Sequence, residues 1–171
     1  MHQKWRNRLT RAETQNRLRI VRRTRPLEPD HWLFQADRAL QRQRGFRNWP
    51  EALTVAYGRE NPKQTVLFTA YDGREPVAAM LFLRHGTGVS YHIGHSSAAG
   101  RQLSAHTVLL WNASCWFAAQ GHHRLDLGLV DTQNAAGLAR FKLGSGARPR
   151  SLGGTWLWWP PLGAGLRFLS A

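Results

Sequence analysis

The stretch from residue 65 to residue 93, TVLFTAYDGREPVAAMLFLRHGTGVSYHI, decides the fold class. It contains three runs rich in β-branched and aromatic residues, Thr65–Tyr71, Val77–Leu83 and Val89–Ile93. Asp72-Gly73 separates the first two runs and His85-Gly86-Thr87-Gly88 separates the last two. Glycine after a polar residue is typical of hairpin turns. The stretch therefore predicts three consecutive antiparallel strands.

Helical patterns lie on both sides of this meander. Asp30 is a suitable N-cap for a helix that ends near Gly45, and Trp49-Pro50-Glu51 opens a second helix. Residues 102–120 are apolar almost all round and predict a long buried helix. Three further elements are expected, a strand at Arg124–Val130, a helix at Asn134–Leu143 and a strand at Thr155–Trp159. The order predicts an α/β (α+β) fold, with a mixed, largely antiparallel twisted sheet flanked by helices.

Two further motifs follow the long helix. Asp126-Leu127-Gly128 ends a strand, and Phe141-Lys142 ends a short helix with Gly144 close behind. This pattern resembles the C-terminal catalytic half of FemAB-like proteins in the GNAT acyltransferase superfamily. The resemblance also includes Tyr91-His92-Ile93-Gly94, Leu109-Leu110-Trp111 and Leu152-Gly153-Gly154-Thr155-Trp156, and it covers roughly residues 65–160. It implies a GNAT-like fold and transfer of an acyl group to an amine.

The charge is concentrated near the N-terminus. The chain has 171 residues, 24 Lys plus Arg, 10 Asp plus Glu and a formal net charge of +14. Residues 1–25 hold nine of the basic side chains and one acid, Glu13, and predict a helix followed by a strand. They are similar to the link between the two halves of longer FemAB-like proteins. We therefore divide the chain into a basic N-terminal arm, residues 1–25, and one GNAT-like domain, residues 26–171, with the arm expected to contact polyanions.

The resemblance assigns catalytic roles to a small set of residues. Phe141 and Lys142 correspond to the pair near the reacting centre, where Lys142 would stabilise developing negative charge or hold a donor phosphate. Asp126 and His92 are candidate bases, because a partly buried carboxylate or an imidazole can accept the proton of an attacking amine. Each of these residues also has an ordinary structural interpretation, as core, as a solvated charge or as the cap of a turn.

The segment between the third strand and the long helix is a candidate donor site. Small residues there leave backbone N–H groups free near a helix N-terminus, which favours a phosphate or a carbonyl oxygen. The candidate donor- and phosphate-binding residues are His95, Ser96, Ser97, Gly100, Arg101 and Arg140. The glycine-rich pyrophosphate loop of CoA-using relatives is not clearly present, which tilts mildly away from CoA. The sequence does not decide between acyl-CoA and aminoacyl-tRNA as donors.

Composition narrows the remaining classes. One cysteine, Cys115, excludes an internal disulfide and a Cys-rich zinc site, and no metal site is expected from the histidines. We expect no tightly bound cofactor, with acyl-CoA only as a co-substrate. The sequence has no apolar run long enough to span a membrane and no secretory signal, so the expected location is the cytoplasm.

Three hypotheses result. The first is an N-acyltransferase that takes an acyl-CoA or aminoacyl-tRNA donor and an amine acceptor. The second is a non-catalytic module that binds RNA or another polyanion. The third is an inactive half-protein, which would need a partner domain or a second copy. Convergence of the basic residues Arg140, Lys142, Arg148 and Arg150 with His92 and Asp126 on one cleft would favour the first. A positive surface at residues 1–25 far from any pocket would favour the second.

Overall fold

The computed structural model describes residues 1–154. Their core is one five-stranded sheet in the order β1-β2-β3-β4-β5. The strands are β1 (Leu18–Arg23), β2 (Thr65–Asp72), β3 (Glu75–His85), β4 (Gly88–Ser96) and β5 (Arg124–Asp126). The first three pairings are antiparallel, and β4 pairs with β5 in parallel. The predicted mixed, largely antiparallel sheet is therefore confirmed.

The meander forms where the sequence placed it. Gly73 and Gly86 occupy the two hairpin turns with φ of 61° and 55°, a region that residues with a Cβ rarely adopt. Apolar residues fill both faces of β3, where Val77 to Leu83 are buried. A strand that is buried on both faces needs helices on both sides of the sheet.

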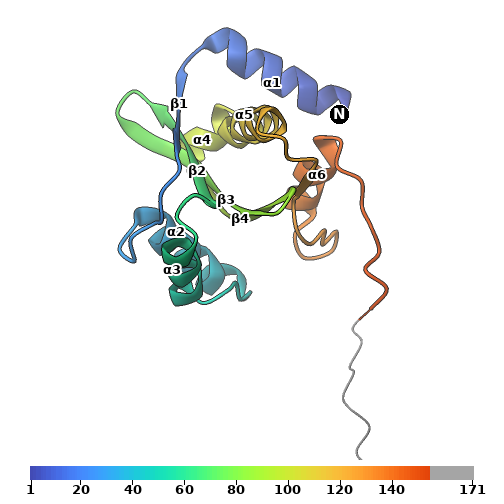
Figure 1. The fold of residues 1–171 in the computed structure, drawn as a ribbon. Helices are drawn as coiled ribbons and strands as arrows, with labels where there is room; N and C mark the ends of the chain where they lie inside the picture. Colours follow the sequence, from blue (N-terminus) through green and yellow to red (C-terminus); the bar gives the residue numbers. More distant parts are fainter. Residues whose placement is uncertain (155–171) are drawn as a thin grey trace, which may run out of the picture.

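Helices cover the two faces of the sheet (Figure 1). On one face lies α5 (Ala105–Ala119), with α1 (Gln3–Gln15) outside it, and on the other lie α2 (Trp32–Arg44) and α3 (Glu51–Glu60). The short α4 (Ala98–Gln102) precedes α5, and α6 (Ala136–Gly144) lies at the β5 end of the sheet.

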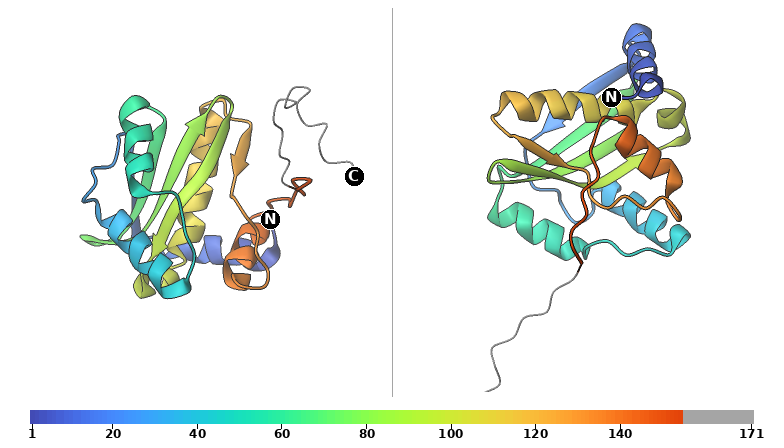
Figure 2. Two further views of the ribbon diagram at one scale, coloured as in Figure 1. Left: turned by 90° about the horizontal axis from the view of Figure 1, so that it is seen from below. Right: turned by 90° about the vertical axis from the view of Figure 1, so that its right-hand side faces the viewer.

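Residues 1–25 form α1 and the edge strand β1. Trp5, Leu9 and Ala12 of α1 are buried in the same cluster as α5, and β1 pairs along its whole length with β2. The N-terminus lies beside α6 (Figure 2), where the His2 amide donates to the Gly144 carbonyl over 2.9 Å. The core of the described structure thus includes side chains from both α1 and β1.

Two predicted elements differ from the structure. The helix expected at residues 102–120 is broken after α4, because Ser104 adopts a left-handed conformation with φ of 55°. The strand expected at Arg124–Val130 ends at Asp126. The strand expected at Thr155–Trp159 lies outside the described residues.

Cys115 is exposed. Within residues 1–154, the helices are all too short or too polar to cross a membrane.

Two irregularities of β4 shape the region beside it. Leu81 pairs with Ile93 and Phe82 pairs with Tyr91, so His92 is the extra residue of a β-bulge. β5 pairs only with the first three residues of β4, Gly88–Ser90, whereas β4 continues along β3 to Ser96. Within residues 1–154, the second half of β4 therefore has no strand on its β5 side.

Candidate active-site cleft

A cleft of about 1120 Å³ lies beside the half of β4 that continues past β5. Its walls come from β4, the α4–α5 junction, the start of α6, the middle of α1 and the end of α2. These segments are far apart in the sequence, and they meet because α1 packs over α5 and α6. The cleft is large enough for an extended ligand of the size that small-molecule sites hold.

The cleft is positively charged. Among the described residues that line it are four arginines and no Asp or Glu, the arginines being Arg8, Arg11, Arg44 and Arg101. The N-terminal end of α5, from Ser104 to Thr107, also lines it. Guanidinium groups and the positive end of a helix dipole both attract anions. The cleft therefore suits a ligand that carries phosphate or another dense negative charge.

The structure brings together five of the candidate site residues. His95, Ser96, Gly100, Arg101 and Phe141 line the cleft. The His95 pKa is lowered, first by burial and then by the Arg101 charge. Arg101 donates from Nη1 to the Ser96 carbonyl over 2.7 Å, which holds its guanidinium at the end of β4.

Ser97 and Arg140 lie outside this lining set. The Ser97 hydroxyl accepts a hydrogen bond from the Gly100 amide over 3.1 Å and so caps α4. Arg140 is exposed on α6, and its Nε donates to the Ala136 carbonyl within the same helix.

Lys142 and Asp126 hold the segment between β5 and α6. The Lys142 side chain is buried, at 5% exposed, and its Nζ donates to the Leu129 carbonyl over 2.8 Å. Asp126 accepts from the Gly128 amide over 2.7 Å. Burial lowers the pKa of Lys142, and the Asp126 charge opposes that shift. Neither side chain is among the described residues that line the cleft.

His92 lies on the α3 side of the sheet. Its Nε2 is 2.8 Å from Thr54 Oγ1, and its ring meets the edge of the Trp49 indole with centroids 5.1 Å apart. Burial lowers the His92 pKa, and the Asp37 charge opposes that shift. His92 therefore belongs to the α2–α3 side of β4, not to the arginine-lined cleft.

Tyr91 was missed by sequence reasoning as a site residue. It lines the cleft, and its hydroxyl lies so close to Gly94 that a Cβ added there would be 1.9 Å from Oη. Burial raises the Tyr91 pKa, and the Asp37 charge raises it further. Oη makes no hydrogen bond with another described residue, and the raised pKa keeps the phenol protonated. The glycine three residues later is the only sequence signal that could have marked it.

His106 was also missed. It lies in the first turn of α5, lines the cleft, and donates from Nε2 to the His95 carbonyl over 2.8 Å. Its ring packs at 6.0 Å from Phe141. Burial lowers the pKa of His106 to about 4, so the imidazole is neutral at physiological pH. His106 thus ties α5 to β4 without adding charge to the cleft.

His106 predicts a loss of stability in acid. Its pKa is about 4 when folded and 6.5 in the reference state, so the unfolded chain binds the extra proton between these values. The stabilisation that the neutral His106 imidazole gives to the folded state is complete above pH 6.5. It is lost as the pH falls toward 4, and the free energy of unfolding then decreases by about 3 kcal/mol in total. Urea unfolding of the wild type at pH 7.5 and 4.5 should show this loss, and His106→Gln should show a pH dependence smaller by about that amount. An equal pH dependence in both proteins would contradict it.

The comparisons with known proteins agree with this architecture. The model of a family described as acetyltransferase (GNAT) domain matches residues 1–144. The chain belongs to the GNAT acetyltransferase family. This confirms the broader part of the resemblance drawn from the sequence, and the match includes α1 and β1 of the GNAT domain. Among curated proteins, none matches the chain significantly.

Solved structures share the GNAT fold at low sequence identity. An aminoglycoside acetyltransferase, meta-AAC0020, from an uncultured soil metagenomic sample is 11% identical with a TM-score of 0.57, over 85% of this chain and 99% of its own. Aminoglycoside N-acetyltransferase AAC(6')-Iy in complex with CoA is 11% identical with a TM-score of 0.54, over 84% and 93%. The C-terminal domain of a putative lysylphosphatidylglycerol synthetase from Agrobacterium fabrum is 14% identical with a TM-score of 0.54, over 84% and 46%.

Proposed function

We propose that this GNAT domain is an N-acyltransferase that uses an acyl-CoA donor and binds it in the arginine-lined cleft. The observation that carries the proposal is the cleft itself, with four arginines and no described carboxylate beside the part of β4 that continues past β5. The presence of CoA in the AAC(6')-Iy structure supports the same donor.

The two halves of such a donor suit two parts of the cleft. The phosphates of CoA carry several negative charges, which Arg8, Arg11 and Arg44 can neutralise from the rim. The remaining arm of CoA contains amide groups. Because residues Tyr91–Ser96 of β4 continue past β5, their backbone can pair with these amides as with an added strand.

The reaction exchanges a thioester for an amide. The nitrogen of the free amine attacks the thioester carbonyl carbon, a C–N bond forms and the C–S bond breaks. Starting from an ammonium ion, one proton reaches the thiolate sulfur and one is released, so the products are an amide, a thiol and a proton. The negative charge that develops needs a hydrogen-bond donor fixed in place. We assign that role to Tyr91, which lines the cleft and whose raised pKa keeps its hydroxyl protonated.

The other candidate residues are proposed in supporting roles. Phe141 forms an apolar wall of the cleft. Lys142 and Asp126 hold the loop after β5 through the Leu129 carbonyl and the Gly128 amide, so we propose that they position the loop. His92 contacts Thr54 and Trp49 on the α2–α3 side of β4.

A donor screen tests the proposal. The full chain is mixed with a primary amine and either acetyl-CoA, longer acyl-CoA thioesters or aminoacyl-tRNA, and the acylated amine is detected by mass. We expect a product with acyl-CoA. Product with aminoacyl-tRNA alone would favour the FemAB-like interpretation, to which the exposed basic side chains of α1 give some support. Binding of tRNA without any product would favour the non-catalytic module.

Removing two cleft arginines should weaken donor binding. Arg8→Gln combined with Arg11→Gln is expected to raise the Kd for CoA about tenfold, because hydrogen bonds to charged groups contribute about 1.5–3 kcal/mol when desolvated and less when exposed. Calorimetry at two salt concentrations should also show a smaller salt dependence. Arg19→Gln combined with Arg22→Gln is the control matched in charge, because both arginines lie on β1 outside the cleft, over the rings of Tyr71 and Trp116 at 4.6 and 4.5 Å from the centroids. Equal losses in both proteins would show that only net charge matters.

A further inference from the structure

A second cavity, of about 270 Å³, lies on the α2–α3 side of β4. Neighbouring residues of the same two elements line this cavity and the arginine-lined cleft. Leu40 of α2 and Gly94 of β4 line the cleft, whereas Gln41 of α2 and Ile93 of β4 line the second cavity. We call this second cavity the Trp49 pocket, after the indole at its rim.

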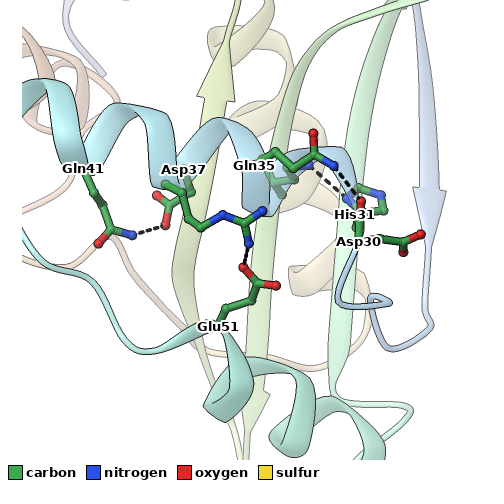
Figure 3. A network of polar contacts seen from close by, with 8 residues as sticks. Asp30, His31, Gln35, Asp37, Gln41 and Glu51 are labelled. Atoms are coloured by element: carbon green, nitrogen blue, oxygen red, sulfur yellow. Dashed lines mark hydrogen bonds and ion pairs between the residues drawn. The ribbon is translucent and has the colours of Figure 1, made fainter.

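The Trp49 pocket holds a buried carboxylate without a cationic partner. Asp37 is only 8% exposed, and its Oδ2 accepts a hydrogen bond from Gln41 Nε2 over 2.6 Å (Figure 3). None of the ion pairs within residues 1–154 includes Asp37. The other carboxylate of the pocket, Glu51, is paired with Arg38. A buried charge is costly unless it is paired, and this chain has 24 basic side chains from which a partner could have come.

Part of the lining of the pocket is apolar. Trp49 is 53% exposed although it is a large aromatic residue, and its indole is held by the edge contact with His92. Phe34 and Ile93, both buried, continue the apolar wall. An exposed indole in a cavity can stack on a flat group or lie under a cation. The pocket therefore pairs one negative charge with one aromatic surface.

We propose that the Trp49 pocket binds the acyl acceptor, and that this acceptor is a small primary amine with a single positive charge and a flat apolar body. The ammonium contacts Asp37 and the flat group stacks on Trp49. This inference rests on the proposed acyltransferase function, because it assigns the second substrate of the same reaction.

Size and charge restrict the acceptor. The volume corresponds to roughly nine water molecules at about 30 Å³ each, which fits an amine of the size of phenethylamine. A polycation would find one unpaired carboxylate, the exposed Arg47 at the rim and a chain of net charge +14. Long-range repulsion therefore selects against polyamines.

The position of Asp37 connects the pocket with the proposed reaction. Its negative charge acts on Tyr91, which lines the arginine-lined cleft, and on His92, the bulge residue between Tyr91 and Ile93. An amine held at Asp37 therefore lies beside the part of β4 where the thioester carbonyl is expected. After the ammonium loses a proton, its nitrogen is the nucleophile that attacks the thioester carbonyl carbon.

Direct binding separates this inference from the proposed function. Calorimetry measures phenethylamine, the uncharged analogue 2-phenylethanol and spermine on the wild type, on Asp37→Asn and on the control Asp30→Asn, whose exposed carboxylate lies outside the pocket. We expect phenethylamine to bind the wild type more tightly than either other probe. Asp37→Asn should raise its Kd at least tenfold, and Asp30→Asn should change it less than twofold.

Two outcomes would overturn the inference. The first is tighter binding of spermine than of phenethylamine to the wild type, which needs no variant to fold. The second is an unchanged Kd for phenethylamine in Asp37→Asn with an intact unfolding transition. CoA is titrated in parallel. If CoA binds while phenethylamine does not, the acceptor assignment fails alone, and if CoA does not bind, the proposed function itself fails.

Discussion

Replacing Tyr91 with phenylalanine is expected to lower kcat at least a hundredfold with acetyl-CoA and an accepted amine. The substitution removes only the phenol oxygen of a residue that lines the cleft. The ring keeps its packing against Phe82, whose centroid is 5.8 Å away. Loss of one fixed donor to a developing negative charge costs about 2.7–4 kcal/mol in comparable acyl-transfer sites. KM for the donor should change little, because the phosphates bind elsewhere in the cleft.

The chain offers a matched control for this substitution. It has three tyrosines, and Tyr71 lies on β2 under the Arg19 guanidinium. Tyr71→Phe should leave kcat within twofold of the wild type. The Kd for CoA, measured by calorimetry, should be unchanged in both variants. A Tyr91→Phe enzyme with full kcat would show that another group stabilises the transition state.

The turns of the meander were predictable because local chemistry fixes them. Gly73 and Gly86 adopt positive φ in the loops where the sequence placed the hairpins. The break between α4 and α5 was not predictable in the same way. Ser104 adopts positive φ without a glycine or proline to mark it, since tertiary packing sets that conformation. β5 stops early because Gly128, at φ 71°, turns the chain after Asp126.

The bulge in β4 explains why the sequence did not identify Tyr91. In a regular strand Tyr91 and Ile93 would face the same side, because side chains alternate with a period of two. The extra residue, His92, changes that alternation. Tyr91 therefore packs with the α5 cluster and Ile93 with the α2–α3 cluster. A one-residue irregularity of this kind leaves no periodic signal in a single sequence.

The charge of the cleft was predicted in sign, but of its four arginines only Arg101 was a predicted site residue. The sequence placed the other cationic side chains of the site at Arg140 and Lys142. The structure instead lines the cleft with Arg8 and Arg11 from α1 and with residues from α2 and α4. These segments meet through the packing of Trp5 and Leu9 into the main core, which depends on contacts distant in sequence. Net charge can be counted from composition, whereas the fold determines which arginines come together in one cleft.

Gly100→Ala is expected to destabilise the protein by about 2 kcal/mol and to weaken donor binding. A Cβ at Gly100 would lie 2.3 Å from the Val77 carbonyl oxygen and 2.7 Å from Ser96 Oγ. The nearest atom belongs to the backbone of β3, so α4 must move away from the sheet. Overpacking of this kind costs about 1–3 kcal/mol, partly offset by the higher helix propensity of alanine. Movement of α4 also displaces Arg101 from the cleft.

Gly137→Ala adds the same methyl group but is expected to raise the stability of the protein. Gly137 lies in α6, and a Cβ there would meet no atom within 4 Å. Alanine should therefore stabilise the helix by about 0.5–1 kcal/mol. For a chain of this size 1 kcal/mol corresponds to about 2–4 °C in Tm. Thermal unfolding should thus show a fall of about 4–8 °C for Gly100→Ala and a small rise for Gly137→Ala. A rise in Tm for both variants would mean that α4 can shift at no cost. The close contact between α4 and β3 would then not fix the position of the segment between β4 and α5.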